Sequence, residues 1–137
     1  MQPTVLESFS GLGAFFGYFG ASVVLLGLFC VVYLRVTPYA ELSLVKEGKT
    51  APAISFGGAV IGFVLPLAGA ITHSVSFLDM ALWALVALVV QVVVFLVLKV
   101  CLPGLVRDIA EDRMGPAIVV AVFSTAAGVL NAACMTW

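Results

Sequence analysis

The stretch Glu47-Gly-Lys-Thr-Ala-Pro-Ala-Ile54 decides the fold, because the chain contains it twice. Sixty-four positions later the sequence reads Glu111-Asp-Arg-Met-Gly-Pro-Ala-Ile118. Internal repeats are sought first because a missed repeat misassigns the whole fold. At this one offset Glu47 and Pro52 recur as Glu111 and Pro116, and the charge of Lys49 recurs as Arg113. A long apolar segment follows each copy, so the sequence predicts two copies of a helix–loop–helix unit.

The composition places this unit in a membrane. The chain is 64% hydrophobic and 9% charged, whereas roughly 25% of the residues in an average soluble domain are charged. Four apolar stretches each supply the ~20 residues that a helix needs to cross a bilayer: Ser8–Leu34, Thr50–Leu78, Met80–Leu98 and Met114–Trp137. We therefore expect an all-α membrane protein of four transmembrane helices. Residues 1–137 form one domain, with repeats at about 11–73 and 76–137.

Several other classes of protein are disfavoured. The first ten residues carry no Lys or Arg, so they lack the basic region of a secretory signal peptide, and the first apolar stretch is interpreted as a retained helix. A net charge of −1 gives no indication of a nucleic-acid partner. The three cysteines lie in or beside apolar runs, where cysteine usually acts as a small hydrophobic residue.

Small residues at helical spacing predict where helices approach closely, because packing drives association where no hydrophobic effect operates between helices. Three of the four helices carry such a face: Gly13, Gly17 and Gly20 in the first, Gly58 and Gly62 in the second, and Ser124 and Gly128 in the fourth. The bulkier side chains of the first helix, including Phe15, Leu25 and Leu26, are expected to face lipid.

The two repeat loops each contain a short segment with apolar and charged residues on different sides. Leu42 and Val45 share one side of the first segment, and Val106 and Ile109 share one side of the second. Both segments are typical of short amphipathic helices that lie at a membrane interface. A plain solvated turn is the competing interpretation.

Polar residues inside a bilayer are costly and are functional candidates. Pro66 lies inside the second helix, where it frees the carbonyl of Gly62 and predicts a kink. Gln91 lies at a similar depth, about 12 to 15 Å into the membrane at 1.5 Å per residue. We expect the Gln91 amide to donate a hydrogen bond to the Gly62 carbonyl, within the chain or across a subunit interface, as structural support. The alternative is a polar path that Gln91 forms with Asn131 and Ser55.

The remaining polar residues have ordinary interpretations. Ser76 and Asp79 have the spacing of a helix-capping pair, with Ser76 as the N-cap of the third helix. His73 is the only histidine, so two-histidine haem ligation within one chain is excluded. The sequence contains no nucleophile–base set, metal-ligand spacing or phosphate-binding loop. We therefore expect no enzyme, no cofactor and no metal site.

The basic residues predict the orientation of the protein. All six flank the two repeat loops: Arg35, Lys46, Lys49, Lys99, Arg107 and Arg113. By the positive-inside rule both loops are cytoplasmic and both termini lie outside. Each unit crosses the membrane twice, so the two repeats point the same way.

Four motifs in order give the chain a resemblance to a known family. These motifs are Thr50-Ala-Pro-Ala-Ile-Ser-Phe-Gly-Gly58, Pro66-Leu-Ala68, Trp83 with Gln91, and Gly128-Val-Leu-Asn-Ala-Ala-Cys-Met135. From about Gly48 to Ala133 the chain resembles the YjfL-type family of uncharacterised bacterial inner-membrane proteins, although it has Ala51-Pro52 where family members more often have an alanine-rich segment. The resemblance implies a membrane location and the helix count, but no chemistry. It also implies a partner of the envelope-stress membrane type.

The sequence thus favours a non-enzymatic inner-membrane protein in contact with the lipid bilayer, acting as a homo-oligomeric scaffold or as a membrane subunit for other proteins. The alternative is a small channel or facilitator with a polar route past Gln91, Pro66 and Asn131. Quinone or lipid handling between the helices is a third class, which no specific residue supports.

Overall fold

The computed structural model describes residues 5–37 and 41–135, and every element in these ranges is a helix. Four long helices and two short ones follow in the order α1 (Val5–Val36), α2 (Glu41–Lys46), α3 (Thr50–His73), α4 (Phe77–Cys101), α5 (Leu105–Ala110) and α6 (Met114–Cys134). The four long helices are long and apolar enough to span a membrane. The prediction of an all-α membrane fold with four transmembrane helices is therefore confirmed. Residues 1–4, 38–40 and 136–137, which the single-domain prediction also covers, lie outside the described part.

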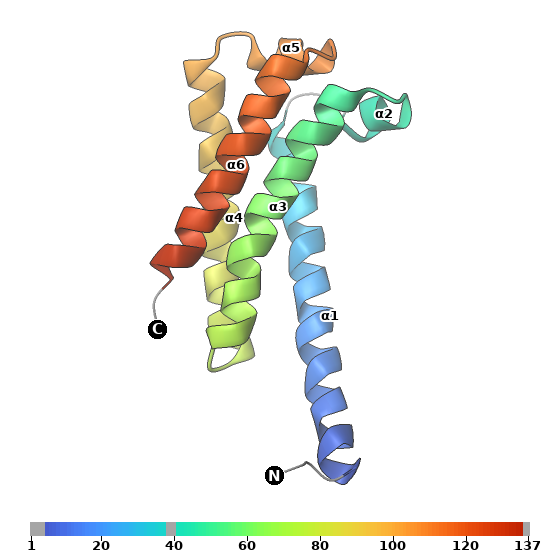
Figure 1. The fold of residues 1–137 in the computed structure, drawn as a ribbon, viewed down its shortest axis with the longest axis vertical. Coiled ribbons are helices and arrows are strands. Elements are labelled where there is room, and N and C mark those ends of the chain that lie inside the picture. Colours follow the sequence, from blue (N-terminus) through green and yellow to red (C-terminus); the bar gives the residue numbers. More distant parts are fainter. Residues whose placement is uncertain (1–4, 38–40, 136–137) are drawn as a thin grey trace.

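The element order long, short, long occurs twice along the chain, as Figure 1 shows. The sequence offset is kept, because α2 and α5 begin sixty-four residues apart, as do α3 and α6. The turn residues at the same offset, Gly48 and Asp112, both have a positive φ, of 88° and 64°. α3 and α6 each begin two residues before their prolines, Pro52 and Pro116. That the chain is built from two repeated units that point the same way stays a prediction.

The closest packing is between α3 and α6, which lie side by side in Figure 1. Small residues allow this approach. A Cβ added at Gly58 would overlap the backbone and side chain of Ala121, and a Cβ at Gly128 would overlap the backbone of Gly62. Such contact leaves no room for side chains between the two backbones, as in other helix pairs of membranes. The hydroxyl of Thr125 adds a hydrogen bond to the carbonyl of Gly58, at 3.4 Å.

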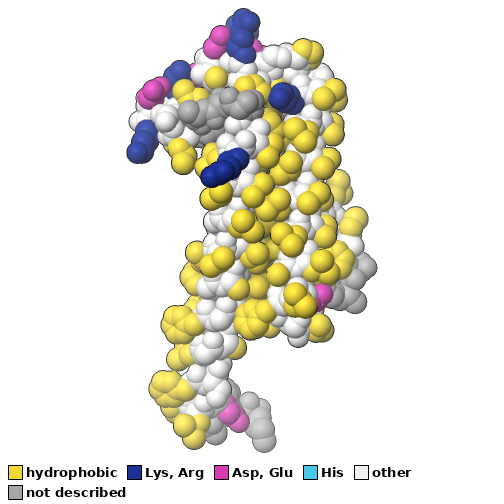
Figure 2. Space-filling view, turned by 180° about the vertical axis from the view of Figure 1, so that it is seen from behind, with side chains coloured by type: hydrophobic (Ala, Val, Ile, Leu, Met, Phe, Trp, Pro, Cys, Tyr) yellow, Lys and Arg dark blue, Asp and Glu magenta, His cyan; other side chains and the backbone are white. Residues whose placement is uncertain are grey.

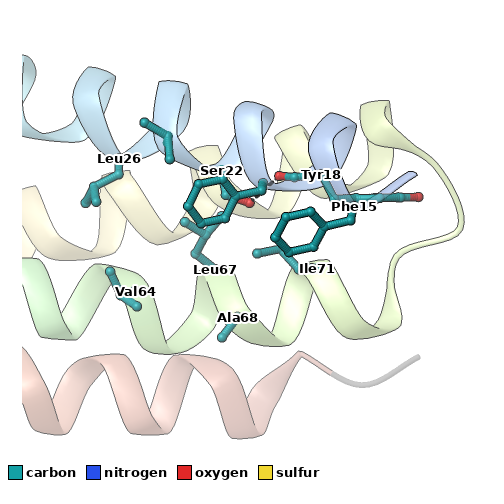
Figure 3. Close-up of a pocket in the computed structure, with 10 residues that line it drawn as sticks. Phe15, Tyr18, Ser22, Leu26, Val64, Leu67, Ala68 and Ile71 are labelled. Atoms are coloured by element: carbon teal, nitrogen blue, oxygen red, sulfur yellow. Dashed lines mark hydrogen bonds between the residues drawn. The ribbon is translucent and has the colours of Figure 1, made fainter. Parts of the chain in front are cut away.

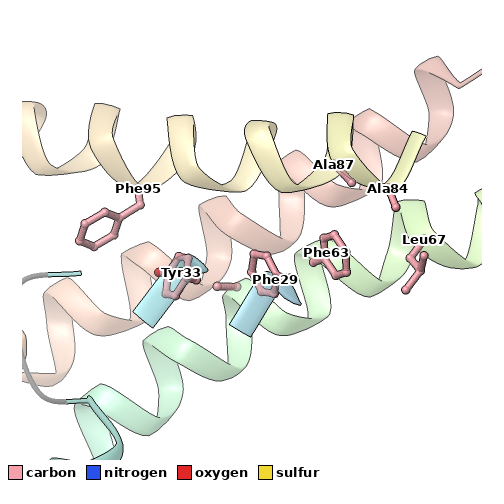
Figure 4. Close-up of a cluster of buried hydrophobic side chains, with 8 residues drawn as sticks. Phe29, Tyr33, Phe63, Leu67, Ala84, Ala87 and Phe95 are labelled. Carbon is pink, nitrogen blue, oxygen red and sulfur yellow. The ribbon is translucent and has the colours of Figure 1, made fainter. Parts of the chain in front are cut away.

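α1 is attached to this core by aromatic side chains (Figure 4). Phe29 stacks on Phe63 of α3, with ring centroids 4.5 Å apart and planes 2° from parallel. Tyr33 contacts Phe95 of α4 edge-on, with centroids 5.8 Å apart. Leu25 and Leu26 pack against the same cluster, so the prediction that these two leucines face lipid is wrong. Offset and edge-to-face ring pairs are favourable. The bulky face of α1 therefore points toward the bundle, and its glycine face does not.

The N-terminus of α4 is capped as its sequence indicates. The hydroxyl of Ser76 accepts a hydrogen bond from the backbone N–H of Asp79, at 3.1 Å. The carboxylate of Asp79 in turn accepts from the N–H of Val75, at 3.2 Å. The prediction of Ser76 as N-cap is confirmed, although the returning bond reaches one residue earlier than in a standard capping box.

The two repeat loops are joined by a pair of polar contacts. The ammonium group of Lys49 donates to the carbonyl of Ala110, at 3.3 Å. The carboxylate of Asp112 accepts from the backbone N–H of Ala51, at 2.8 Å. A cation therefore lies at the C-terminus of α5 and an anion at the N-terminus of α3, which are the two placements that the helix dipole favours.

We predict that Asp112→Ala lowers the free energy of unfolding by about 1 kcal/mol, because the first turn of α3 loses its acceptor. Asp112→Asn is the matched control, since it keeps a side-chain oxygen and tolerates the left-handed backbone at φ 64°. Thermal unfolding in a mild detergent compares the two variants. Equal losses in both variants would attribute the effect to the charge and not to the hydrogen bond.

Charged side chains gather at the end of the molecule that carries α2 and α5, as Figure 2 shows. The two short helices differ there. α5 buries Leu105 and Ile109, at 1% and 0% exposure, whereas α2 leaves 57% of Leu42 exposed. Both predicted short helices are present, but the buried pair in α5 is Leu105 with Ile109, and Val106 is only partly buried. The apolar side of α2 is open to its surroundings.

Candidate functional site

Gln91 is the polar side chain at the centre of the bundle. It lies near the middle of α4, between α3 and α6, and only 1% of its surface is exposed. Its Nε2 atom donates a hydrogen bond to the backbone carbonyl of Ser124 on α6, at 3.0 Å. Ser124 is also 1% exposed. The amide therefore links α4 to α6 in the interior of the protein.

The prediction that this amide bonds the carbonyl of Gly62 is wrong for the single chain, because the amide bonds Ser124. Pro66 removes the N–H that would normally pair with that carbonyl, but Gly128 of α6 lies directly against it. The freed carbonyl thus faces the backbone of α6 at Gly128. The Gln91 amide bonds the carbonyl of Ser124, which lies one helical turn before Gly128 in α6. α3 continues through Pro66 to His73.

The polar capacity of this centre is only partly used. Within the described ranges, neither Oε1 of Gln91 nor Oγ of Ser124 has a hydrogen-bond partner, although both atoms are buried. A buried polar group without a partner costs roughly 1–3 kcal/mol. Gln91 and Ser124, together with the Gly62 backbone, form what we call the polar centre.

The other two polar candidates lie away from the polar centre. Ser55 is fully buried, and its hydroxyl donates to the carbonyl of Pro52 in its own helix, at 3.1 Å. Asn131 is half-buried, and its buried Nδ2 has no hydrogen-bond partner within residues 5–37 and 41–135. Ser55 is seven residues before Gly62 and Asn131 seven after Ser124, so each lies about 10 Å from the centre along its helix. Close contacts of Gly58 and Gly128 separate these three positions.

His73 lies at the opposite end of the bundle from the basic loops. Its ring nitrogen Nδ1 is 3.1 Å from the carbonyl of Gly69 and 3.0 Å from the hydroxyl of Thr72, and the group is exposed. Across the part of the chain that the structure describes, no three His, Cys, Asp or Glu side chains lie close enough together to hold a metal ion.

An apolar groove of ≈ 340 Å³ lies between α1 and α3, toward the end of the bundle away from α2 and α5 (Figure 3). Phe15, Tyr18 and Phe19 line it from α1, and Leu67 and Ile71 line it from α3. The hydroxyl of Ser22 also lines it, but this hydroxyl donates to the carbonyl of Tyr18 at 2.6 Å. The groove therefore offers apolar surface that suits a lipid tail and little polar specificity.

Sequence reasoning found Gln91 but missed its partner. The signal that was present is the four-residue step from Ser124 to Gly128, which marks the α6 face that lies on α3. What the sequence does not give is the relative shift of the two helices. That shift, and not depth alone, selects the carbonyl that Gln91 reaches.

We predict that Gln91→Leu lowers stability by about 0.6 kcal/mol, and by no more than about 1.7 kcal/mol, as measured for interhelical hydrogen bonds in membranes. Ser124→Ala is the matched control, because the acceptor is a backbone carbonyl and survives the change. Its effect should be close to zero. Thermal unfolding of both variants in the same detergent is the measurement. An equal loss in Ser124→Ala would show that its hydroxyl is the partner.

Four apolar helices, a core of direct backbone contacts and basic residues at one end define a small multi-pass α-helical membrane protein. Residues 7–135 match the family described as Domain of Unknown Function (DUF350), and the chain belongs to that family. It is 35% identical over 124 residues to the UPF0719 inner membrane protein YjfL of Escherichia coli (strain K12). The match covers 90% of this chain and 94% of that protein, and the same figures hold for YjfL of Escherichia coli O157:H7.

These findings confirm the resemblance seen in the sequence and extend it to α1. No solved structure matches the chain. The chain is accordingly a multi-pass inner-membrane protein of an uncharacterised family.

Proposed function

We propose that this protein is a non-enzymatic scaffold or membrane subunit that works as an oligomer. The carrying observation is the state of α1. The core of α3, α4 and α6 is complete without the outer face of α1. In the most apolar 18-residue stretch of α1 only 6% is buried inside the protein, against 44% in that of α3. A membrane-spanning helix with so little of its surface packed against its own chain has that surface available to another protein.

The proposed orientation places both repeat loops in the cytoplasm and both termini outside. The gathering of basic side chains at the end with α2 and α5 supports it, since Lys and Arg favour the cytoplasmic side. The common offset of the short helices supports two units that point the same way in one integral domain.

Reporter fusions test this topology. We predict that alkaline phosphatase, which is active only outside the cytoplasm, is active when fused after Trp137 and inactive when fused after Lys46. A cytoplasmic fluorescent reporter at the same two positions should give the opposite pattern. If both reporters gave the reverse of these patterns, the protein would have the opposite orientation to the one proposed.

A small channel or facilitator is the second candidate. The unpaired oxygen of Gln91 favours it, together with the polar positions at Ser55 and Asn131 on either side. Close helix contacts separate these positions within one chain, so a route past them needs the helices to move or a second copy to contribute.

The mass of the complex extracted in native-like lipid, followed by ion flux from liposomes made with the same sample, tests the two candidates. The scaffold predicts an oligomer without flux, or an oligomer that retains another membrane protein; the envelope-stress partner implied by the resemblance is to be sought there. Flux that falls in Gln91→Leu would favour the channel. A single-chain mass with no partner would overturn the scaffold.

A further inference from the structure

The outward face of α1 carries a regular seven-residue pattern. Gly13, Gly20 and Gly27 are seven positions apart, and three or four positions from each lies a larger side chain, namely Phe9, Phe16 or Val23. A sustained 3.5-residue period of this kind is the signature of two helices that wind around each other with a left-handed twist. The glycines provide holes and the larger side chains provide knobs. We call these six residues the heptad face.

The heptad face is open in the single chain. A Cβ at Gly13, Gly20 or Gly27 would meet no other part of the described chain within 4 Å. Phe9, Phe16 and Val23 are 63%, 68% and 51% exposed. At 3.6 residues per turn, the side chains that attach α1 to the bundle, such as Phe29 and Tyr33, lie on the other side of the helix. Val23 lies at the edge of the heptad face, where it also lines the groove between α1 and α3. Most of the heptad face is therefore left uncovered by the described part of the chain.

α1 also extends past the bundle at its N-terminal end (Figure 1). The ring of Tyr18 stacks on Phe77, the first residue of α4, with centroids 4.4 Å apart. The twelve residues from Val5 to Phe16 therefore project about 18 Å beyond that level. Counting from Arg35, a 30 Å hydrocarbon core ends near Phe15. By this count Phe9 lies about 9 Å beyond the end of the hydrocarbon core.

We propose that a second copy of this chain covers the heptad face, with the two α1 helices parallel. This inference rests on the proposed oligomer and names its interface. In a parallel pair like layers meet, so that layers of Phe or Val alternate with layers of glycine, and each large side chain enters a hole formed in part by glycines of the other copy. Two membrane copies with one orientation can pair the heptad face in register, and the pairing also covers the projecting phenylalanines.

The area agrees with a pair of this kind. With roughly 200 Å² for each phenylalanine, Phe9 and Phe16 alone offer on the order of 250 Å² per copy. Val23 and the backbone along three glycines bring the total for a symmetric pair to on the order of 800 Å², which approaches the ~1,000 Å² that a specific interface should clear.

Cysteine cross-linking in native membranes tests the pairing. Starting from a variant with Cys30, Cys101 and Cys134 replaced by Ala, single cysteines are placed at Phe9, Phe16 and Val23, and at Leu12, Phe15 and Phe19 as controls on other faces of the same helix. Oxidation should give covalent dimers at the first three positions and few at the controls. Cross-links of equal yield on all faces, or stronger ones at the controls, would overturn the pairing.

The mass in native-like lipid separates this inference from the proposed function. Gly20→Ile should reduce the complex to smaller units, whereas Gly11→Ile, at an open glycine outside the heptad face, should leave the mass unchanged. An oligomer that persists in Gly20→Ile without cross-links would refute this interface and leave the oligomer standing. A single-chain mass for the unaltered protein would refute both.

Discussion

Gly128→Ala should prevent α3 and α6 from packing, and this is the largest single effect that we expect. A Cβ at residue 128 would overlap the carbonyl and Cα of Gly62. Both obstacles are backbone atoms of a helix, so no rotamer change relieves the clash. Overpacking in a core typically costs 1–3 kcal/mol, and a clash with backbone should reach at least about 3 kcal/mol. Low yield of folded protein in detergent and a lowered melting temperature are the expected readouts.

The chain supplies close controls for this prediction. A methyl group added at Gly57 or Gly69 of α3, or at Gly115 of α6, would meet no other described part of the chain within 4 Å. Changing these glycines to alanine should be neutral or slightly stabilising, because alanine has the higher helix propensity by about 1 kcal/mol. Gly58→Ala should resemble Gly128→Ala, since Ala121 blocks it. The comparison of Gly57 with its neighbour Gly58 is the sharpest one. A neutral Gly58→Ala would contradict the close packing of α3 on α6.

Gly58 of α3 and Gly128 of α6 also show what the sequence can predict. Small residues every four positions in α3 and α6 indicated close approach, and charge-free runs of about twenty residues indicated the four spans. Such features depend on local pattern and on bilayer thickness, which the sequence carries directly. The capping of α4 by Ser76 belongs to the same group, because its partner is three residues away.

The sequence does not predict features that depend on the relative position of neighbouring helices along their axes. Gln91 and Gly62 have matching depths, yet the bond goes to Ser124. The bulk of Leu25 and Leu26 predicts that they face lipid, although in a membrane a leucine packs equally well against protein or lipid. Aromatic contacts of Phe29 with Phe63 decide the matter, and the sequence does not show which rings meet.

Phe29→Ala should loosen α1 from the bundle. The side chain is fully buried and contacts both Phe63 and Tyr33, with ring centroids 4.5 and 5.5 Å away. Replacing a buried phenylalanine by alanine costs 3–5 kcal/mol in a water-soluble core. In a bilayer the lower end, about 3 kcal/mol, is expected, because lipid can solvate the detached helix.

Spin-label distances between α1 and α3 measure this loosening directly and should broaden in Phe29→Ala. Phe19→Ala is the control on the same helix, because Phe19 is 58% exposed and its ring stacks on Phe15 of α1 itself. Since the proposed pairing lies on the opposite face, Phe29→Ala should leave the cross-link at Phe16 in place while α3 moves away. Loss of both together would mean that α1 pairs only when the bundle holds it at a fixed angle. Unchanged distances in Phe29→Ala would show that contacts nearer the N-terminus, such as Tyr18 on Phe77, are sufficient to hold α1.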